Sequence, residues 1–242
     1  MSFFMVIKLL LSHLFIALNI YEAHSTEFTV KNNCGYKIWA ATQTGTGPQI
    51  PTGFELPPKA SNTLTVTPPW SGRLWARTQC SGPSGALVCN TGDCTTGKIE
   101  CNSPGGKPPA SLVEYTLAGA DQKDFYDISL VDGFNVPVSV QPTGPNCPTT
   151  SCSSNVNSAC PNELALRGDD GAVIGCRSAC TVFQQPQYCC TGSYGSPTTC
   201  RPTNYSMIFK KQCPQAYSYA YDDSSGIFTC PTGGNYVITF CP

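Results

Sequence analysis

Five acidic side chains gather in one segment of the chain, residues 114–134, which contains no cysteine although the whole chain has 16. Two carboxylates that flank a sugar–sugar bond, one protonated and one ionised, are what the hydrolysis of a glycoside requires. Ionised carboxylates also accept hydrogen bonds from sugar hydroxyls without any turnover. The segment is therefore the first candidate for a binding or catalytic site, and its acids are Glu114, Asp121, Asp124, Asp127 and Asp132.

The amino-terminal segment excludes other catalytic groups. Residues 9–20 form an apolar run of twelve, with a basic residue before it and small residues after it, and the run is short for a bilayer span. This pattern predicts a secretory signal peptide over residues 1–25, cleaved before Thr26. An uncleaved anchor is the alternative, which the polar residues inside the run argue against. His13 and His24 leave with the signal peptide, so the mature chain lacks the histidine that serine or cysteine nucleophiles and histidine zinc sites use.

The cysteines indicate an oxidising compartment. All 16 lie in the mature part, and an even number in an exported chain predicts eight disulfides and no free thiol. Cysteine-only metal sites are the alternative, which is uncommon in such a chain. We therefore expect no metal and no cofactor, and carboxylates remain as the groups for catalysis, helped by Arg, Lys or Tyr.

Charge excludes one class of partner. Without Lys8 and Glu22 of the signal peptide, the chain has 13 Lys+Arg and 14 Asp+Glu. A nearly neutral chain with no basic run is not expected to bind nucleic acid. With 22 Gly, 21 Pro and only 12% charged residues, the composition is typical of a loop-rich β protein.

Strands are the elements that must position the carboxylates. Alternating apolar residues predict a hairpin over residues 28–40, with a turn signal at Asn32-Asn33-Cys34-Gly35. Short helical turns are expected near residues 161–166 and 176–183. Further strands are predicted over residues 64–66, 73–77, 111–117, 125–140 and 236–240.

The strand over residues 73–77 carries two arginines. If Leu74 and Ala76 face the core, Arg73, Trp75 and Arg77 share the opposite face, because strand side chains alternate. Solvation on an outer face is the plainer interpretation of both arginines.

Strand geometry also limits the acidic segment. Asp127 and Asp132 are five residues apart and point to opposite faces of a regular strand. Both reach one site only if the strand ends or bulges before Asp132. The nearby aromatic residues could stack on sugars, although core packing is their expected role: Tyr115, Phe125, Tyr126 and Phe134.

Cysteine density divides the mature chain into three parts. A β body is predicted over about residues 26–78, 110–146 and 214–242. A small disulfide-held insert covers about residues 79–109, and a larger, partly helical one covers about residues 147–213. Each disulfide contributes about 2–4 kcal/mol, so eight of them predict resistance to heat, acid and proteases.

One segment carries a family signature. Residues 85–101 read GALVCNTGDCTTGKIEC, whose core, C-x-T-G-D-C, resembles the signature of thaumatin-like proteins; Leu87 departs from the usual Gly or Phe, which affects packing. Seven blocks in the family's order extend the resemblance over the mature chain: NNCGYKIWA, GRLWARTQC, LVEYTLAG, DFYDISLVDGFNVPV, QYCC, CPQAYSYAYDD and ITFCP.

The resemblance implies a mainly β fold, a flattened antiparallel β-sandwich body with two disulfide-rich satellite domains. It also implies how the cysteines pair, which their spacing alone leaves open. The implied pairs are Cys34 with Cys241, Cys80 with Cys89, Cys94 with Cys101, Cys147 with Cys230, Cys152 with Cys213, Cys160 with Cys176, Cys180 with Cys189, and Cys190 with Cys200.

The resemblance further implies a site. Thaumatin-like proteins include plant pathogenesis-related and ripening proteins, often antifungal; many bind β-1,3-glucans and some hydrolyse them weakly. Their cleft is lined by one Arg, one Glu and three Asp. The matching positions are Arg73, Glu114, Asp127, Asp132 and Asp222, with Asp223 the weaker alternative for the last; Asp121 and Asp124 are then expected to be solvated loop residues.

Three functions remain open. The first is a secreted, extracellular, antifungal defence protein that binds cell-wall β-1,3-glucan, with fungal membrane or wall proteins as further candidate partners. The second is an endo-β-1,3-glucanase in which Glu114 is the acid, Asp127 is the base or nucleophile, and Arg73 keeps a neighbouring aspartate ionised. The third is a ripening or storage-like protein with a vestigial cleft. A monomer is expected, and Asn204 is the predicted N-glycosylation site.

Overall fold

A computed structural model describes residues 25–83, 85–103 and 105–242. Residues 1–24 of the predicted signal peptide lie outside the described residues. Within these three ranges, no helix combines the length and the apolar character that crossing a membrane requires.

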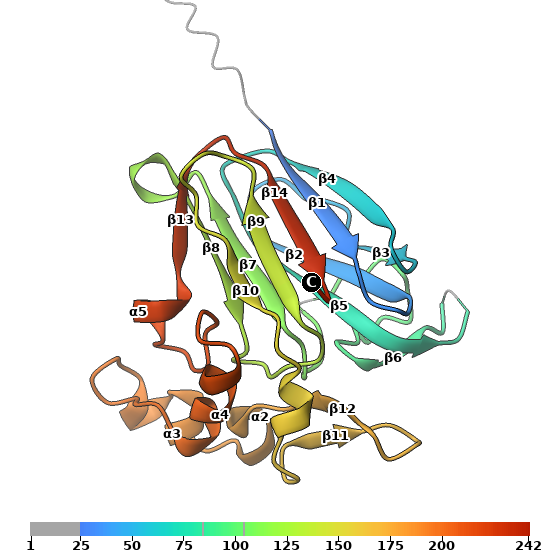
Figure 1. Ribbon diagram of the computed structural model, residues 1–242, viewed down its shortest axis with the longest axis vertical. Coiled ribbons are helices and arrows are strands. Elements are labelled where there is room, and N and C mark those ends of the chain that lie inside the picture. The colour runs from blue at the N-terminus through green and yellow to red at the C-terminus, as the bar shows by residue number, and fades with distance from the viewer. Residues whose placement is uncertain (1–24, 84, 104) are drawn as a thin grey trace, which may run out of the picture.

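Two β-sheets pack face to face and form the body (Figure 1). The first sheet has five strands, and among them the pair β1–β14 is parallel whereas the other pairs are antiparallel. Its strands, in spatial order, are β10 (Thr150–Cys152), β9 (Val138–Pro142), β14 (Tyr236–Phe240), β1 (Thr26–Asn32) and β4 (Ser61–Val66).

The second sheet is antiparallel and has seven strands. Its strands, in spatial order, are β13 (Phe228–Pro231), β8 (Lys123–Ser129), β7 (Leu112–Leu117), β5 (Trp70–Ser81), β2 (Ile38–Thr46) and β3 (Gly53–Leu56), and β6 (Val88–Thr91) pairs with the end of β5. The predicted fold class, a mainly β sandwich with eight disulfides, is confirmed.

Aromatic side chains from both sheets fill the space between them. Phe28 of β1 stacks on Tyr115 of β7 with ring centroids 4.4 Å apart, and Tyr236 of β14 meets Tyr126 of β8 edge to face at 5.4 Å. Phe134 is also fully buried. Core packing is therefore the role of Tyr115, Tyr126 and Phe134, as expected.

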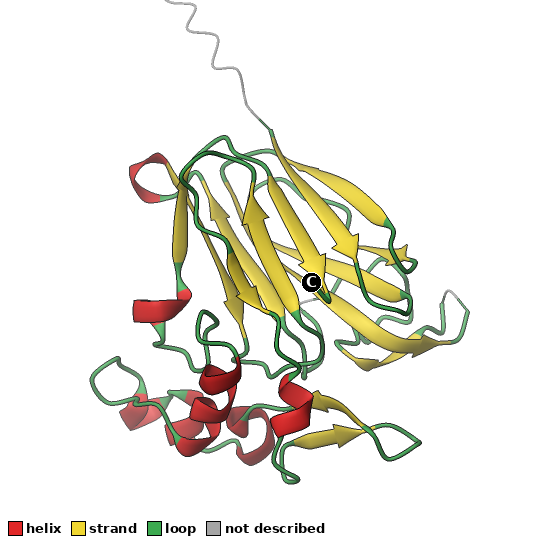
Figure 2. Ribbon diagram, in the orientation of Figure 1, coloured by secondary structure: helices red, strands yellow, loops and turns green. Residues whose placement is uncertain are grey.

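The segment 147–213 contains most of the helical structure, which Figure 2 shows gathered below the sheets. Its elements are η2 (Val156–Ala159), β11 (Ala165–Arg167), β12 (Val173–Cys176), α2 (Ala179–Phe183), α3 (Pro186–Cys189), η3 (Gly192–Tyr194) and α4 (Asn204–Gln212). The predicted helical turn at 176–183 is confirmed by α2, whereas the one at 161–166 runs into β11. Outside this segment the chain forms η1 (Ala120–Gln122) and α5 (Asp223–Gly226).

Eight disulfides join the 16 cysteines in the pairs that the resemblance implied. Cys34–Cys241 links two residues 207 apart in sequence and holds the carboxyl end to the body. Cys147–Cys230 ties the start of the helical segment to the chain that follows it, and Cys152–Cys213 ties its start to its end. The described residues contain no free cysteine.

The predicted hairpin over residues 28–40 is wrong. Strand β1 pairs with β14 and β4 in the first sheet, whereas β2 pairs with β3 and β5 in the second. The connection between them crosses from one sheet to the other, and the Asn32 amide stabilises it by donating to the carbonyls of Tyr36 and Leu56, each at 2.8 Å.

Arg77 also departs from expectation, because it is only 1% exposed. Its guanidinium donates to the carbonyls of Trp39 and Lys98, at 3.2 and 3.0 Å, and to that of Ile99 at 2.5 Å. Burial lowers the pKa of Arg77 to about 10. The small insert covers this part of the outer face, so Arg77 fastens the insert to the body instead of meeting solvent.

Candidate functional site

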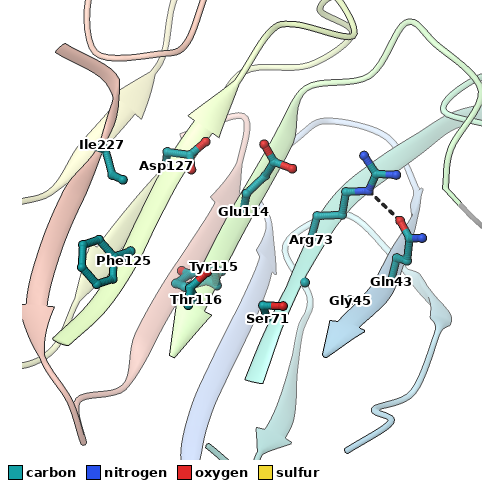
Figure 3. A pocket seen from close by; sticks show the side chains of 11 residues that line it. Gln43, Gly45, Ser71, Arg73, Glu114, Tyr115, Thr116, Phe125, Asp127 and Ile227 are labelled. Carbon is teal, nitrogen blue, oxygen red and sulfur yellow. Dashed lines mark hydrogen bonds between the residues drawn. The ribbon is translucent and has the colours of Figure 1, made fainter. Parts of the chain in front are cut away.

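Four polar side chains form a row across the outer face of the second sheet. The strand register places Gln43 of β2 opposite Arg73 of β5, Arg73 opposite Glu114 of β7, and Glu114 opposite Asp127 of β8. Directly opposed residues have Cβ atoms about 4.5–5.5 Å apart and share a face. Figure 3 shows the row, with the hydrogen bond of 2.6 Å from Arg73 Nε to Gln43 Oε1.

Two hollows meet along this row, because Arg73, Glu114 and Asp127 line both. One has a volume of about 360 Å³, and its other walls include Phe125 and the exposed Ile227. The second has a volume of about 290 Å³ and extends toward the helical segment; its further lining includes Ser129, Asp132 and Tyr217. We call the two hollows together the acidic cleft.

A turn brings Asp132 to the acidic cleft. The sequence allowed Asp127 and Asp132 to share one site only if the strand ended before Asp132. Strand β8 does end at Ser129, and Asp132 lines the cleft together with Asp127. Gly133 follows with φ of +95°, where any Cβ would overlap the carbonyl oxygen of Cys176. This turn leaves Asp132 Oδ2 4.0 Å from Arg73 Nη1.

Burial and neighbouring charges favour protonation of Asp127. Burial, followed by the charges of Glu114 and Asp223, raises the pKa of Asp127 to about 8. Its Oδ1 atom is buried and accepts no hydrogen bond from the residues that the structure describes. At neutral pH, Asp127 therefore holds a proton that it can donate.

At the other two acids of the cleft, Glu114 and Asp132, the charge of Arg73 lowers the pKa and so opposes the effect of burial. Burial raises the pKa of Glu114, the charge of Arg73 opposes this, and the charge of Asp132 adds to it. Burial also raises the pKa of Asp132, again opposed by Arg73. Arg73 thus favours the ionised form of Glu114, which makes Asp127 the candidate acid and Glu114 the candidate base, the opposite of the roles expected from sequence.

Asp222 differs from the expectation that it lines the cleft. It is 6% exposed, lines neither hollow, and forms an ion pair of 2.7 Å with Lys210 of α4. Its Oδ2 also accepts from the Ser218 amide and hydroxyl at 2.9 and 2.8 Å. Asp223 instead accepts from Tyr217 at 2.8 Å and adds to the field at Asp127. Consecutive residues at the start of α5 thus face different surroundings, and the charge near the cleft belongs to Asp223.

Asp124 was expected to be a solvated loop residue, and this is wrong. It is fully buried, and it accepts from the Ala118 amide at 2.9 Å, Thr232 Oγ1 at 3.1 Å and the Tyr236 hydroxyl at 2.8 Å. On β8, Asp124 shares the core-facing parity of Tyr126. Asp121 is exposed, as expected.

Sequence reasoning missed two groups of the cleft. Gln43 carries no charge and lies 30 residues before Arg73, so only the pairing of β2 with β5 reveals it. Ile227 directly precedes β13, and only the pairing of β13 with β8 brings it to the cleft. The predicted glycosylation site, Asn204, is exposed at the first residue of α4, where Ser206 forms a capping box with Thr203.

No group of three or more His, Cys, Asp or Glu side chains arranged to hold a metal ion occurs in the ranges that the structure describes. The side chains of the acidic cleft form a set that can serve as a hydrogen-bonding surface for hydroxyls, as an acid–base pair, or as both.

The double sheet, the eight disulfides and the acidic row define a class of disulfide-stabilised β-sandwich proteins. The family model described as Thaumatin family matches residues 32–242, and the chain belongs to this family. It is 58% identical to thaumatin-like protein 1 of Pyrus pyrifolia over 90% of this chain and 92% of that protein. It is 53% identical to a protein of Prunus avium named glucan endo-1,3-beta-glucosidase, over 91% of this chain and 92% of that one.

A further relative is pathogenesis-related protein 5 of Arabidopsis thaliana, 52% identical over 90% of this chain and 91% of that protein. Among solved structures, a laminaripentaose-producing beta-1,3-glucanase in complex with laminaritetraose superposes with a TM-score of 0.61. The match covers 90% of this chain and 99% of that one at 14% identity, so it shows a shared fold.

Proposed function

We propose that this protein is a secreted defence protein that binds a β-1,3-glucan chain of fungal cell walls along the acidic cleft. The observation that carries the proposal is the row of Arg73, Glu114 and Asp127 between two hollows. A groove that continues on both sides of its polar groups suits a chain of sugar units better than a single small ligand.

The chemistry of the cleft walls supports the same ligand. Carboxylates accept hydrogen bonds from sugar hydroxyls, while Arg73 and the Gln43 amide donate to sugar oxygens. Phe125 and the 45% exposed Ile227 provide an apolar wall against which the C–H face of a sugar ring can pack. The relative from Prunus avium that is named a glucan endo-1,3-beta-glucosidase supports the choice of β-1,3-linked glucan.

Retention on insoluble glucan tests this proposal. The purified protein is expected to stay on β-1,3-glucan and to pass through cellulose. Removing charge with Glu114→Gln and Asp132→Asn together should weaken retention at least about tenfold, because each lost charge-assisted hydrogen bond costs about 1.5–3 kcal/mol. Asp121→Asn is the control, since it removes an exposed acid that lies in the connection between β7 and β8 and does not line the acidic cleft. Equal retention of all three proteins would refute binding along the acidic cleft, and passage of the unmodified protein through the β-1,3-glucan would leave the ripening or storage-like function.

Hydrolysis is a second candidate, favoured by the raised pKa of Asp127 beside Glu114 and Arg73. In this mechanism, Asp127 gives its proton to the glycosidic oxygen as the bond to the anomeric carbon breaks. The Glu114 carboxylate either takes a proton from the attacking water or attacks the anomeric carbon itself.

Release of reducing sugar from laminarin measures hydrolysis directly. Asp127→Asn and Glu114→Gln are each expected to reduce the rate at least about 100-fold, the usual contribution of a general acid or base. Asp121→Asn should keep the full rate. Binding without release in the unmodified protein would restrict the function to glucan recognition.

Secretion is supported by the use of all 16 cysteines in disulfides, which persist in oxidising compartments. Amino-terminal sequencing of the protein recovered from the extracellular fluid should begin at Thr26. A protein that retains residues 1–25 in the membrane fraction would contradict this.

A further inference from the structure

A third hollow lies apart from the acidic cleft and is larger, with a volume of about 690 Å³. It opens where the start of β2 and the end of β5 face the helical segment, and its walls include Tyr36, Gln79, Asn155, Asn157 and Ile174. Figure 1 shows β12, which carries Ile174, in the lower part of the molecule and β5 in the body above it. We call it the amide hollow. Its size lies within the range of small-molecule sites.

The small insert separates the two sites. On β2, Ala41 lies between Gln43, which lines the acidic cleft, and Trp39, which lines the amide hollow. Ala41 is fully buried in a cluster with Trp75 and with Cys94 and Cys101 of the insert. Among the described residues, none lines both the amide hollow and either half of the acidic cleft, so a ligand in one does not fill the other.

The amide hollow is suited to an uncharged ligand. Among its lining residues Lys37 alone is charged, and the Lys37 ammonium is already engaged, 3.1 Å from a Glu55 carboxylate oxygen and 4.6 Å from the centroid of the Trp39 ring. The acidic cleft differs in this respect, because several charged groups line it.

Amide side chains supply both donors and acceptors in this hollow. Four line it: Gln79, Asn135, Asn155 and Asn157. The fold itself uses the Asn135 amide, which is 5% exposed and hydrogen-bonded at both its oxygen and its nitrogen, so the other three are the candidates for a ligand. The Asn157 Oδ1 atom is buried and accepts no hydrogen bond from the residues that the structure describes, while its Nδ2 donates to the Asn135 carbonyl at 3.3 Å. A buried acceptor without a donor is costly, and a ligand hydroxyl would satisfy it once the Asn157 amide turns toward the hollow.

Tyr36 supplies an aromatic face. The residue lines the hollow and is 49% exposed, so part of its side chain remains open to a ligand. An open ring beside amides and the apolar Ile174 matches a sugar unit, which presents hydroxyls at its edge and C–H groups on its face.

We propose that the amide hollow is a second carbohydrate-binding site, which takes a neutral oligosaccharide. It does not depend on glucan binding in the acidic cleft. Two sites on one molecule would increase its hold on a polysaccharide, because the second contact is made within an already bound complex.

Amide-resolved NMR of the complete mature protein tests the proposal. The probes are neutral hexaoses of β-1,3-glucan, β-1,4-glucan and β-1,4-xylan, each titrated to about 10 mM, which detects binding in the millimolar range. At least one hexaose is expected to shift the Asn155, Asn157 and Ile174 signals saturably. Tyr36→Ala should weaken this binding about tenfold and Tyr36→Phe less, because Phe keeps the ring.

Tyr194→Ala is the matched control, since Tyr194 is 39% exposed on η3 and does not line the amide hollow. It should leave the titration unchanged. The proposal is overturned if none of the hexaoses shifts these three signals, or if Tyr36→Ala binds as tightly as the unmodified protein. Glu114→Gln with Asp132→Asn should remove only shifts at the acidic cleft, so failure of one site is distinguishable from failure of the other.

Discussion

Two aspartates of β8, three residues apart, have opposite environments. Asp124 faces the core and accepts hydrogen bonds from an amide and two hydroxyls. Asp127 faces the acidic cleft, where one carboxylate oxygen is buried and accepts no hydrogen bond from the residues described. The comparison teaches that burial alone does not identify a functional acid. The functional candidate is the one whose hydrogen-bonding capacity the fold leaves unused.

Asp222 belongs with Asp124 in this comparison. Lys210 and Ser218 satisfy its carboxylate, which attaches α4 to the chain before α5. The fold thus contains two kinds of acid: buried acids whose hydrogen bonds hold elements together, and half-buried acids that line the cleft.

The largest expected effect is that of Asp124→Ala. The substitution leaves three donors without their acceptor, among them the buried Tyr236 hydroxyl, so we expect the free energy of unfolding to fall by about 3–5 kcal/mol. Urea unfolding with the disulfides intact measures it. A loss below about 1 kcal/mol would mean that Asp124 does not hold the core together.

Lys210→Met should have the next largest effect. It leaves Asp222 buried without its cation, so we expect the free energy of unfolding to fall by about 2–4 kcal/mol. The fall is smaller than for Asp124→Ala because the hydrogen bonds from Ser218 remain. The double variant Lys210→Met, Asp222→Leu should recover part of this loss, since it removes the unpaired charge. Additive losses in the double variant would contradict the pairing.

Asp127→Asn should act in the opposite direction. The folded pKa of Asp127 lies above its ordinary value of 3.8, at about 8, so between these values the folded state binds more protons than the unfolded state. Stability therefore falls as the pH rises through this window. Asp127→Asn removes that loss. We expect its free energy of unfolding to exceed that of the unmodified protein by about 1–2 kcal/mol at pH 8 and to be almost equal to it at pH 3.

Unfolding midpoints of both proteins from pH 3 to about pH 8 measure this difference. Parallel curves would show that Asp127 titrates alike in the folded and unfolded states, and the distinction from Asp124 would then fail.

Asp121→Asn should have the smallest effect, within about 0.5 kcal/mol. The side chain is exposed, and its φ of 56° is a conformation that asparagine adopts readily. The same unfolding measurement checks this. A larger loss would show that the β7–β8 connection does more than join two strands.

Much of the body follows from local sequence patterns. Apolar residues over 64–66 and 236–240 predicted parts of β4 and β14, and the family resemblance implied the cysteine pairs and the positions of Arg73 and Glu114. These inferences depend on strand periodicity and on sequence motifs, which can be recognised without knowing how distant strands pair.

Properties that depend on distant pairing could not be read in this way. Turn residues after Asn32 show that the chain reverses, but not that β1 and β2 enter different sheets. Arg77 is polar, and only the position of the small insert buries it. Asp222 and Asp223 are chemically identical neighbours, and the position of Lys210 on α4 distinguishes them.

The central proposal is that the half-buried Asp127 binds a glucan ligand, whereas the fully buried Asp124 serves only the fold. Carbon NMR of the two carboxyl groups, titrated with pH in the presence and absence of laminarihexaose, tests it most directly. We expect Asp127 to titrate well above its ordinary value, near pH 8, and to change when the hexaose binds, while the Asp124 signal is unaffected by the ligand. An Asp127 signal that titrates near pH 4 and ignores the hexaose would contradict the claim.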